Sequence, residues 1–173
     1  MQKTDCILSI NGGSSGIKFS LYRIKDPIEQ LLYGELENTR TKKAKLNFNN
    51  VLDKQKSSFN IEAADHEQAV NHLIDWLEKQ EDFDSIKAIG HRIVHGMKHT
   101  EPELITDELL DELKKIIAFD SEHLPEEIKL IEVFNKRYPD LKQIACFDTS
   151  FHTSMPNFAK LISITHRYFE LGF

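Results

Sequence analysis

A short loop rich in glycine and serine carries residue types suited to binding an anion. Residues 11–18 read N-G-G-S-S-G-I-K. Glycines such as Gly13 lack a Cβ atom, so backbone N–H groups can approach a phosphate, and the hydroxyls of Ser14 and Ser15 add donors. Lys18 adds a full positive charge. Asn-Gly between apolar runs is also a strong signal for a plain hairpin turn, and the residues leave both interpretations open.

A charged residue within an apolar run is the second candidate. Residues 90–96 read G-H-R-I-V-H-G, and the guanidinium of Arg92 offers a planar fork of donors that matches a carboxylate or a phosphate. Composition alone favours the alternative, an arginine on an edge strand that reaches solvent. A zinc site from His91 and His95 is the weakest interpretation, because residues four apart on a strand lie too far apart to chelate one ion.

Asp148 is the third candidate, because it directly follows the apolar run of residues 143–147. A carboxylate at the end of a strand can be held rigidly at the mouth of a cleft. The alternative is an aspartate that caps a helix or forms an Asx turn. The sequence does not separate these two interpretations.

The elements that must position these residues begin with strands. Ile17, Phe19 and Leu21 alternate with polar residues, which places Lys18 on the strand face that points away from the core. Strands are predicted at residues 6–10, 16–22, 31–37, 44–48, 58–61, 86–94 and 143–147. The glycine-serine loop joins the first two as a hairpin.

Three helices are predicted from apolar residues at helical spacing. Asp65 is a suitable N-cap for the first, with Gln68 three residues further on, and this helix extends to about residue 80. Thr106 caps the second. Its apolar stripe consists of Leu109, Leu110, Leu113, Ile116 and Ile117. Pro125 suits the first position of the third helix, which ends before Pro139.

Hairpin-linked strands followed by alternating helices and strands are typical of a mixed sheet covered by helices, so the predicted fold class is α/β. In such sheets ligands bind beyond the carboxyl ends of strands, where the three candidate motifs lie. The 173 residues, 40% of them hydrophobic, suffice for one globular domain. The net charge of −6 is spread along the chain without basic blocks, which argues against nucleic-acid and membrane partners.

Both cysteines, Cys6 and Cys146, lie in apolar runs without a C-x-x-C spacing. This pattern predicts buried, reduced thiols and suits the cytoplasm. The apolar run at residues 6–10 is too short for a signal sequence or a membrane span. We therefore expect no export.

Taken together, the three motifs resemble those of the acetate kinase family. In this sequence they read N-G-G-S-S-x-x-K-F, G-H-R-x-V-H-G and F-D-T-x-F-H-x-x-M-P. The resemblance covers the chain from near Cys6 to Phe173. It implies a ribonuclease-H-like mixed sheet flanked by helices, with three antiparallel strands before helices and strands alternate, in one lobe of a two-lobed kinase. Residues 1–173 would be the N-terminal carboxylate-binding domain, without the C-terminal nucleotide-binding domain.

The resemblance assigns the first motif to magnesium and ATP as cofactors. Asn11 matches the residue that helps to hold Mg²⁺. Lys18 matches a residue near the phosphates of ATP, and Gly13, Ser14 and Ser15 belong to the same phosphate-facing loop.

The resemblance assigns the other motifs to the carboxylate substrate. Arg92 matches the residue that binds the carboxylate, Val94 a residue that lines the methyl pocket, and His123 a histidine of the same site. Asp148 matches the residue usually described as the proton donor or acceptor. Glu122 stands where the family usually has a leucine of the methyl pocket, so either the specificity for acetate is altered or the loop has shifted and Glu122 faces solvent.

The implied reaction is the reversible transfer of the γ-phosphoryl group of ATP to acetate, giving acetyl phosphate and ADP. Propionate or butyrate kinase is the alternative within the family, and a non-catalytic binding lobe is the alternative outside it. Without a second lobe we expect the chain to be inactive and monomeric, whereas full-length family enzymes are homodimers. A carboxylic acid is already ionised at neutral pH, so Asp148 is expected to orient magnesium, its water or Arg92 rather than act as a base.

Overall fold

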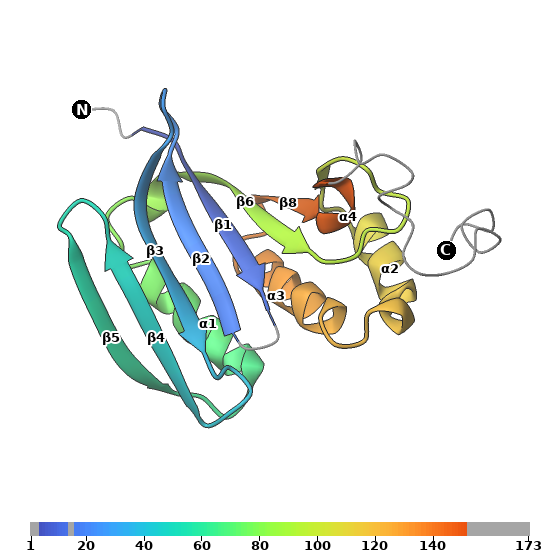
Figure 1. Ribbon diagram of the computed structural model, residues 1–173, viewed down its shortest axis with the longest axis horizontal. Coiled ribbons are helices and arrows are strands. Elements are labelled where there is room, and N and C mark those ends of the chain that lie inside the picture. The colour runs from blue at the N-terminus through green and yellow to red at the C-terminus, as the bar shows by residue number, and fades with distance from the viewer. Residues whose placement is uncertain (1–3, 14–15, 152–173) are drawn as a thin grey trace, which may run out of the picture.

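The structure, a computed structural model, describes residues 4–13 and 16–151. These residues are built around one mixed sheet (Figure 1). Its strands are β1 Cys6–Gly12, β2 Gly16–Arg23, β3 Glu29–Glu37, β4 Lys43–Asn50, β5 Gln55–Glu62, β6 Ile86–Ile93, β7 Glu103–Leu104 and β8 Lys142–Phe147. They lie in the order β5-β4-β3-β2-β1-β6-β8-β7. The observed α/β class agrees with the prediction.

Strands β1 to β5 form an antiparallel meander. Ile17, Phe19 and Leu21 of β2 are at most 3% exposed, whereas Lys18 between them is exposed, as the alternation predicts. The family resemblance implied three antiparallel strands here, and the described chain has five. The two additional strands, β4 and β5, extend the sheet at the edge far from β6 (Figure 1).

The other half of the sheet is parallel at its centre. Strand β6 pairs in parallel with β1 on one side and with β8 on the other. The two-residue strand β7, which the sequence did not predict, adds to β8 in the antiparallel direction. The carboxyl ends of β1, β6 and β8 therefore lie at the same edge of the sheet.

Three helices pack against this sheet: α1 His66–Leu77, α2 Asp107–Lys115 and α3 Leu124–Arg137. Helices α1 and α3 lie on one face, and α3 contacts β1, β6 and both other helices (Figure 1). The side chains of Asp65 and Thr106 accept hydrogen bonds from the backbone of Gln68 and Leu109, so both predicted N-caps are confirmed. Pro125 lies in the first turn of α3.

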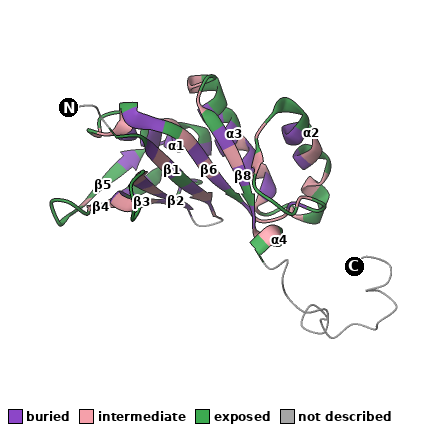
Figure 2. Cartoon of the chain, turned by 90° about the horizontal axis from the view of Figure 1, so that it is seen from above, coloured by how far each residue is buried: buried purple, intermediate pink, exposed green. Residues whose placement is uncertain are grey.

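Buried residues, purple in Figure 2, lie along the strands of the sheet and on α1, α2 and α3. One cluster lies mainly under β1 to β5 and α1, and a second joins β6 and β8 to α2 and α3. Cys6 is buried as predicted, but the prediction for Cys146 was wrong. Cys146 pairs in register with Arg92 and is exposed with it on the sheet face that no described helix covers.

Two helix boundaries differ from the prediction. Helix α1 ends at Leu77 rather than near residue 80, because its last turn tightens and Lys79 donates to the carbonyl of Trp76. Helix α2 ends at Lys115, and Ile117 lies in a short 3₁₀ turn instead. Within the described ranges, no helix has the length and apolar character needed to cross a membrane.

Candidate anion-binding site

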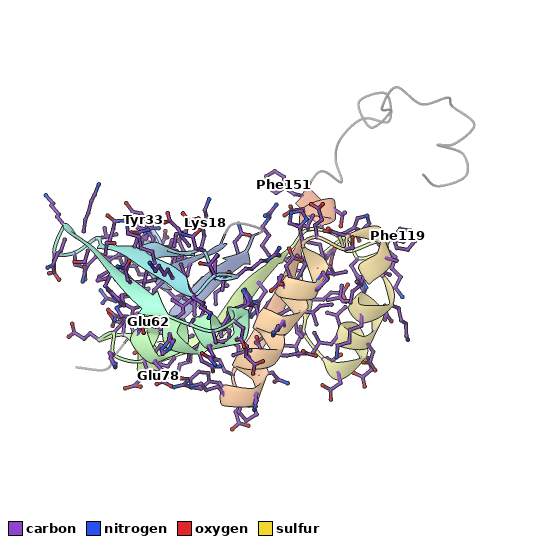
Figure 3. All side chains as sticks on the ribbon, turned by 90° about the horizontal axis from the view of Figure 1, so that it is seen from below. Lys18, Tyr33, Glu62, Glu78, Phe119 and Phe151 are labelled. Carbon is purple, nitrogen blue, oxygen red and sulfur yellow. The ribbon has the colours of Figure 1, made fainter. Side chains whose placement is uncertain are left out.

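The strand register aligns three of the predicted site residues in one row across the sheet. Lys18 on β2 pairs with Asn11 on β1, and Asn11 pairs with Arg92 on β6. Residues paired in register point to the same face of a sheet. All three side chains therefore rise from the face opposite α3, and Figure 3 shows Lys18 on that side.

Arg92 is held on two sides. Its Nε donates to Oδ1 and Oδ2 of Asp148 at 2.9 and 3.0 Å, and its Nη2 donates to Oδ2 as well. On the other side, its Nη1 donates to Oδ1 of Asn11 at 3.1 Å. These hydrogen bonds to Asp148 raise the pKa of Arg92, because the carboxylate stabilises the cation.

The pair of Arg92 and Asp148 results from the order of the strands. Asp148 begins the short helix α4, Asp148–Phe151, directly after β8, and β8 lies beside β6. The alternative of an arginine on an edge strand is wrong, because β6 lies between β1 and β8. Arg92 and Asp148 are still 42% and 40% exposed, so a small ligand can reach both.

A small cavity of about 260 Å³ opens at this row. It is lined by Asn11, Gly13, Gly16, Lys18, Arg92, Val94 and His123. The cavity thus brings together predicted residues from β1, β2, the end of β6 and the loop before α3, whereas Asp148 does not line it and contacts Arg92. A larger, mostly apolar cavity of about 820 Å³ lies against α2, but none of the predicted site residues lines it.

Two glycines of the glycine-serine loop pair with each other across the hairpin. Gly13 and Gly16 exchange two backbone hydrogen bonds, of 2.8 and 3.3 Å. The N–H of Gly13 therefore already donates to Gly16 and is not free to meet a phosphate in this conformation. Ser14 and Ser15 lie outside the described residues.

The loop before α3 contributes His123 to the cavity. Its Nδ1 lies 3.0 Å from Oδ1 of Asp120, and its backbone N–H donates to the same oxygen. Asp120 thus holds both the backbone and the imidazole ring of His123 in place, a role that the sequence analysis did not assign to it. Glu122 is exposed, which agrees with the shifted-loop interpretation.

A buried carboxylate lies on the helix side of the strand ends. Glu127 of α3 is only 1% exposed, and both its oxygens accept from the backbone N–H of Val94, at 3.3 and 3.2 Å. Desolvation raises the pKa of Glu127 from 4.5 to about 7. The sequence analysis missed this residue. The sequence pattern that could have revealed Glu127 is its position on the apolar stripe of a helix, three residues after Leu124 and four before Ile131.

The described residues do not fit a complete magnesium site. The amide oxygen of Asn11 already accepts from Arg92, and the carboxylate of Asp148 is occupied by the same guanidinium. No three His, Cys, Asp or Glu side chains in the described part of the chain are grouped to hold a metal ion. The two histidines of the second motif have other partners. Nε2 of the buried His91 lies 2.7 Å from Oε1 of Gln143, and Nδ1 of His95 accepts a hydrogen bond from the backbone N–H of Met97.

Fold and site define an α/β protein that gathers cationic, amide and carboxylate groups at the carboxyl ends of parallel strands. The chain belongs to the acetokinase family, which matches residues 6–172. It is 38% identical over 177 residues to an acetate kinase from Borrelia duttonii, a match that covers 97% of this chain and 43% of the relative. An acetate kinase from Oceanobacillus iheyensis is 36% identical over 168 residues, with 95% and 42% coverage.

Solved structures show the same fold. A propionate kinase from Francisella tularensis superposes with a TM-score of 0.80 at 32% identity, covering 98% of this chain and 43% of that one. An acetate kinase from Porphyromonas gingivalis has a TM-score of 0.81 at 23% identity, covering 97% and 43%. The chain thus spans less than half the length of the relatives that it matches.

Proposed function

We propose that this chain is the N-terminal, carboxylate-binding domain of an acetate kinase. The reaction of the two-lobed enzyme is the reversible transfer of the γ-phosphoryl group of ATP to acetate, giving acetyl phosphate and ADP. The observation that carries the proposal is the guanidinium of Arg92, which Asp148 and Asn11 fix at the rim of a cavity that Lys18 also lines. Family membership supports the same assignment.

The chemistry places few demands on this domain beyond positioning. Acetate is ionised at neutral pH and attacks phosphorus without losing a proton, so no general base is needed. Phosphoryl transfer depends chiefly on alignment and on neutralising the charge of the phosphoryl oxygens. Arg92 would bind the carboxylate, Lys18 would approach the phosphates, and Asp148 would hold the fork of Arg92 in one orientation.

Mg²⁺ and ATP remain the proposed cofactors of the complete enzyme. From the described residues, Asn11 would supply at most one oxygen ligand to the metal ion, and only after exchanging its bond with Arg92. Further ligands must then come from outside the described residues.

Propionate kinase is the second candidate. It is favoured by the Francisella propionate kinase, which matches this fold at 32% identity. Val94 lines the cavity, while Glu122 is exposed and places no charge beside it. An apolar substrate tail beside Val94 is compatible with acetate and with its longer homologues, including butyrate.

The partners in this proposal are a small carboxylate, ATP and a C-terminal nucleotide-binding domain, and they include neither nucleic acid nor a membrane. Closure of two lobes is what excludes water and completes the clamp on the phosphates. We therefore propose that residues 1–173 alone are inactive and monomeric, that the complete enzyme is a homodimer, and that it acts in the cytoplasm.

Trapping of acyl phosphate with hydroxylamine tests the proposal. The assay contains MgATP with acetate, propionate or butyrate, and it compares this chain alone with a chimera in which the remainder of the Borrelia duttonii relative follows it. We expect no product from the chain alone and product from the chimera that is lost in Arg92→Ala. A chimera that folds but gives no product with any of the three acids would refute the proposed function.

A further inference from the structure

Glu127 lies between two of the strand ends that build the site. It lies near Gly12 at the end of β1, where an added Cβ atom would be 3.9 Å from the Cγ of Glu127. The same side chain holds the N–H of Val94, the first residue after β6. One buried carboxylate thus joins α3 by hydrogen bonds to the end of the strand that carries Arg92, close to the end of the strand that carries Asn11.

The charges around Glu127 belong to the same site. Arg92 of β6 attracts its negative charge, and so does His123 from the loop before α3. Asp120 from that loop repels it. Strand β1 comes near Glu127 at Gly12, which carries no charge. The neighbouring Glu126 is directed elsewhere, towards Arg40 and His66.

We propose that Glu127 is a positioning residue of the carboxylate site, which anchors the backbone of Val94 and whose protonation sets the affinity of Arg92 for an anionic substrate. This inference rests on the proposed function. An ionised Glu127 offsets part of the positive charge of Arg92 that attracts the substrate, whereas a protonated Glu127 does not. Carboxylate binding therefore favours proton uptake by Glu127, and deprotonation of Glu127 weakens binding.

The simpler alternative is that Glu127 only anchors the first turn of α3 and has no influence on the ligand. Both accounts explain the hydrogen bond to Val94, so loss of stability in a variant does not separate them. The pH dependence of ligand binding does. The raised pKa of Glu127, about 7, puts its titration within reach of measurements in the folded state.

The anchor is tested first, by following the amide signal of Val94 in NMR spectra of the chain from well below to well above pH 7. In the wild-type chain this signal should titrate with the protonation of Glu127. Glu127→Gln keeps an oxygen acceptor of the same shape and should abolish the titration, while Glu127→Ala should speed hydrogen exchange of the Val94 amide. Identical titration curves for wild type and Glu127→Gln would overturn the inference.

The influence on the ligand is tested by titrating acetate at several pH values. Wild-type affinity should fall by about tenfold as pH rises through the titration of Glu127, as expected for a like charge nearby at the effective dielectric of a protein. Glu127→Gln should flatten this dependence. Glu132→Gln is the matched control, because Glu132 lies on the same helix but pairs with Lys114.

The two proposals fail in different ways. If acetate leaves the Arg92 side-chain signal unmoved at every pH, the proposed function fails, while the Val94 titration still reports on the anchor. If acetate binds but wild type and Glu127→Gln show the same pH dependence, the inference about Glu127 fails and the carboxylate site stands.

Discussion

Arg92 and Asp148 are 56 residues apart in the sequence, yet the guanidinium of Arg92 contacts both carboxylate oxygens of Asp148. The contact exists because β6 and β8 are parallel neighbours, so that the residues at their carboxyl ends meet. Asn11 completes the arrangement from β1. A charged fork is thereby held in one orientation at the mouth of a small cavity, which is the property that binding of a carboxylate requires.

Asp148→Asn tests whether this aspartate positions Arg92 or transfers a proton. The asparagine keeps one oxygen acceptor, but it loses the negative charge and the second oxygen that accepts from the guanidinium of Arg92. In the two-lobed chimera we expect acyl phosphate formation to fall by about a hundredfold, the order that misplacement of a reacting group produces. The loss should be equal at every pH. A new or missing limb in the pH–rate profile would indicate proton transfer by Asp148 instead.

Arg92→Lys tests the need for a planar fork. Lysine keeps the charge but has a single ammonium group, which cannot reproduce the two-sided contacts of the guanidinium with Asp148 and Asn11. Acetate binding measured by NMR titration should weaken by about tenfold or more, with the fold unchanged by circular dichroism. Arg137→Lys is the control, because Arg137 pairs with Asp75 and Glu78 away from the cavity.

The protonation of Glu127 should make stability depend on pH. Its pKa is raised from 4.5 to about 7 in the folded state, so the unfolded chain releases this proton first as pH rises. Stability is therefore full below pH 4.5 and declines between 4.5 and about 7. Glu127→Gln removes this decline and should be more stable than wild type above pH 7, by up to about 3 kcal/mol.

Urea unfolding of wild type and of Glu127→Gln across this pH range measures the difference between their free energies of unfolding. His91 acts in the opposite sense, because burial lowers its pKa from 6.5 to about 4 and stability is lost as pH falls through that interval. His91 is present in both proteins, so its contribution cancels in the difference curve. A difference that does not change with pH would show that Glu127 does not titrate as described.

Gly96→Ala should destabilise the chain. A Cβ atom at Gly96 would lie 2.5 Å from the ring of Phe147, on the strand that leads to Asp148. We expect a loss of about 1–3 kcal/mol in the free energy of unfolding, the range for forcing an extra carbon into a packed core. Gly90→Ala is the matched control, since its nearest neighbour would be Cys146 at 3.9 Å. Equal stabilities of the two variants would contradict the packing around Gly96.

Local patterns predicted much of the fold. Alternation in β2 placed Lys18 on the open face, and the caps Asp65 and Thr106 marked the starts of two helices, because these signals depend only on neighbours in the sequence. The edge strand β7 was missed because a two-residue strand has no periodicity to detect. Cys146 was misassigned because an apolar strand does not reveal which of its faces a helix covers.

The site was harder to predict than the fold. Each motif alone had an equally simple structural explanation, and only the family resemblance joined them. The contact between Arg92 and Asp148 depends on β8 lying next to β6, a pairing across 56 residues that no local pattern encodes. Glu127 was missed because a glutamate in the first turn of a helix is ordinary, and only the fold shows that this one points to Val94.

The most direct test of the account is an acetate titration of the isotopically labelled chain, followed through the side-chain Nε–H signals of its arginines. Arg92 and Arg137 both donate through Nε to carboxylates, but only Arg92 lines the cavity. We predict a saturable shift of the Arg92 signal while the Arg137 signal stays in place. Equal, unsaturated shifts of both signals, or no shift of Arg92, would contradict the assignment of a carboxylate site to this row of residues.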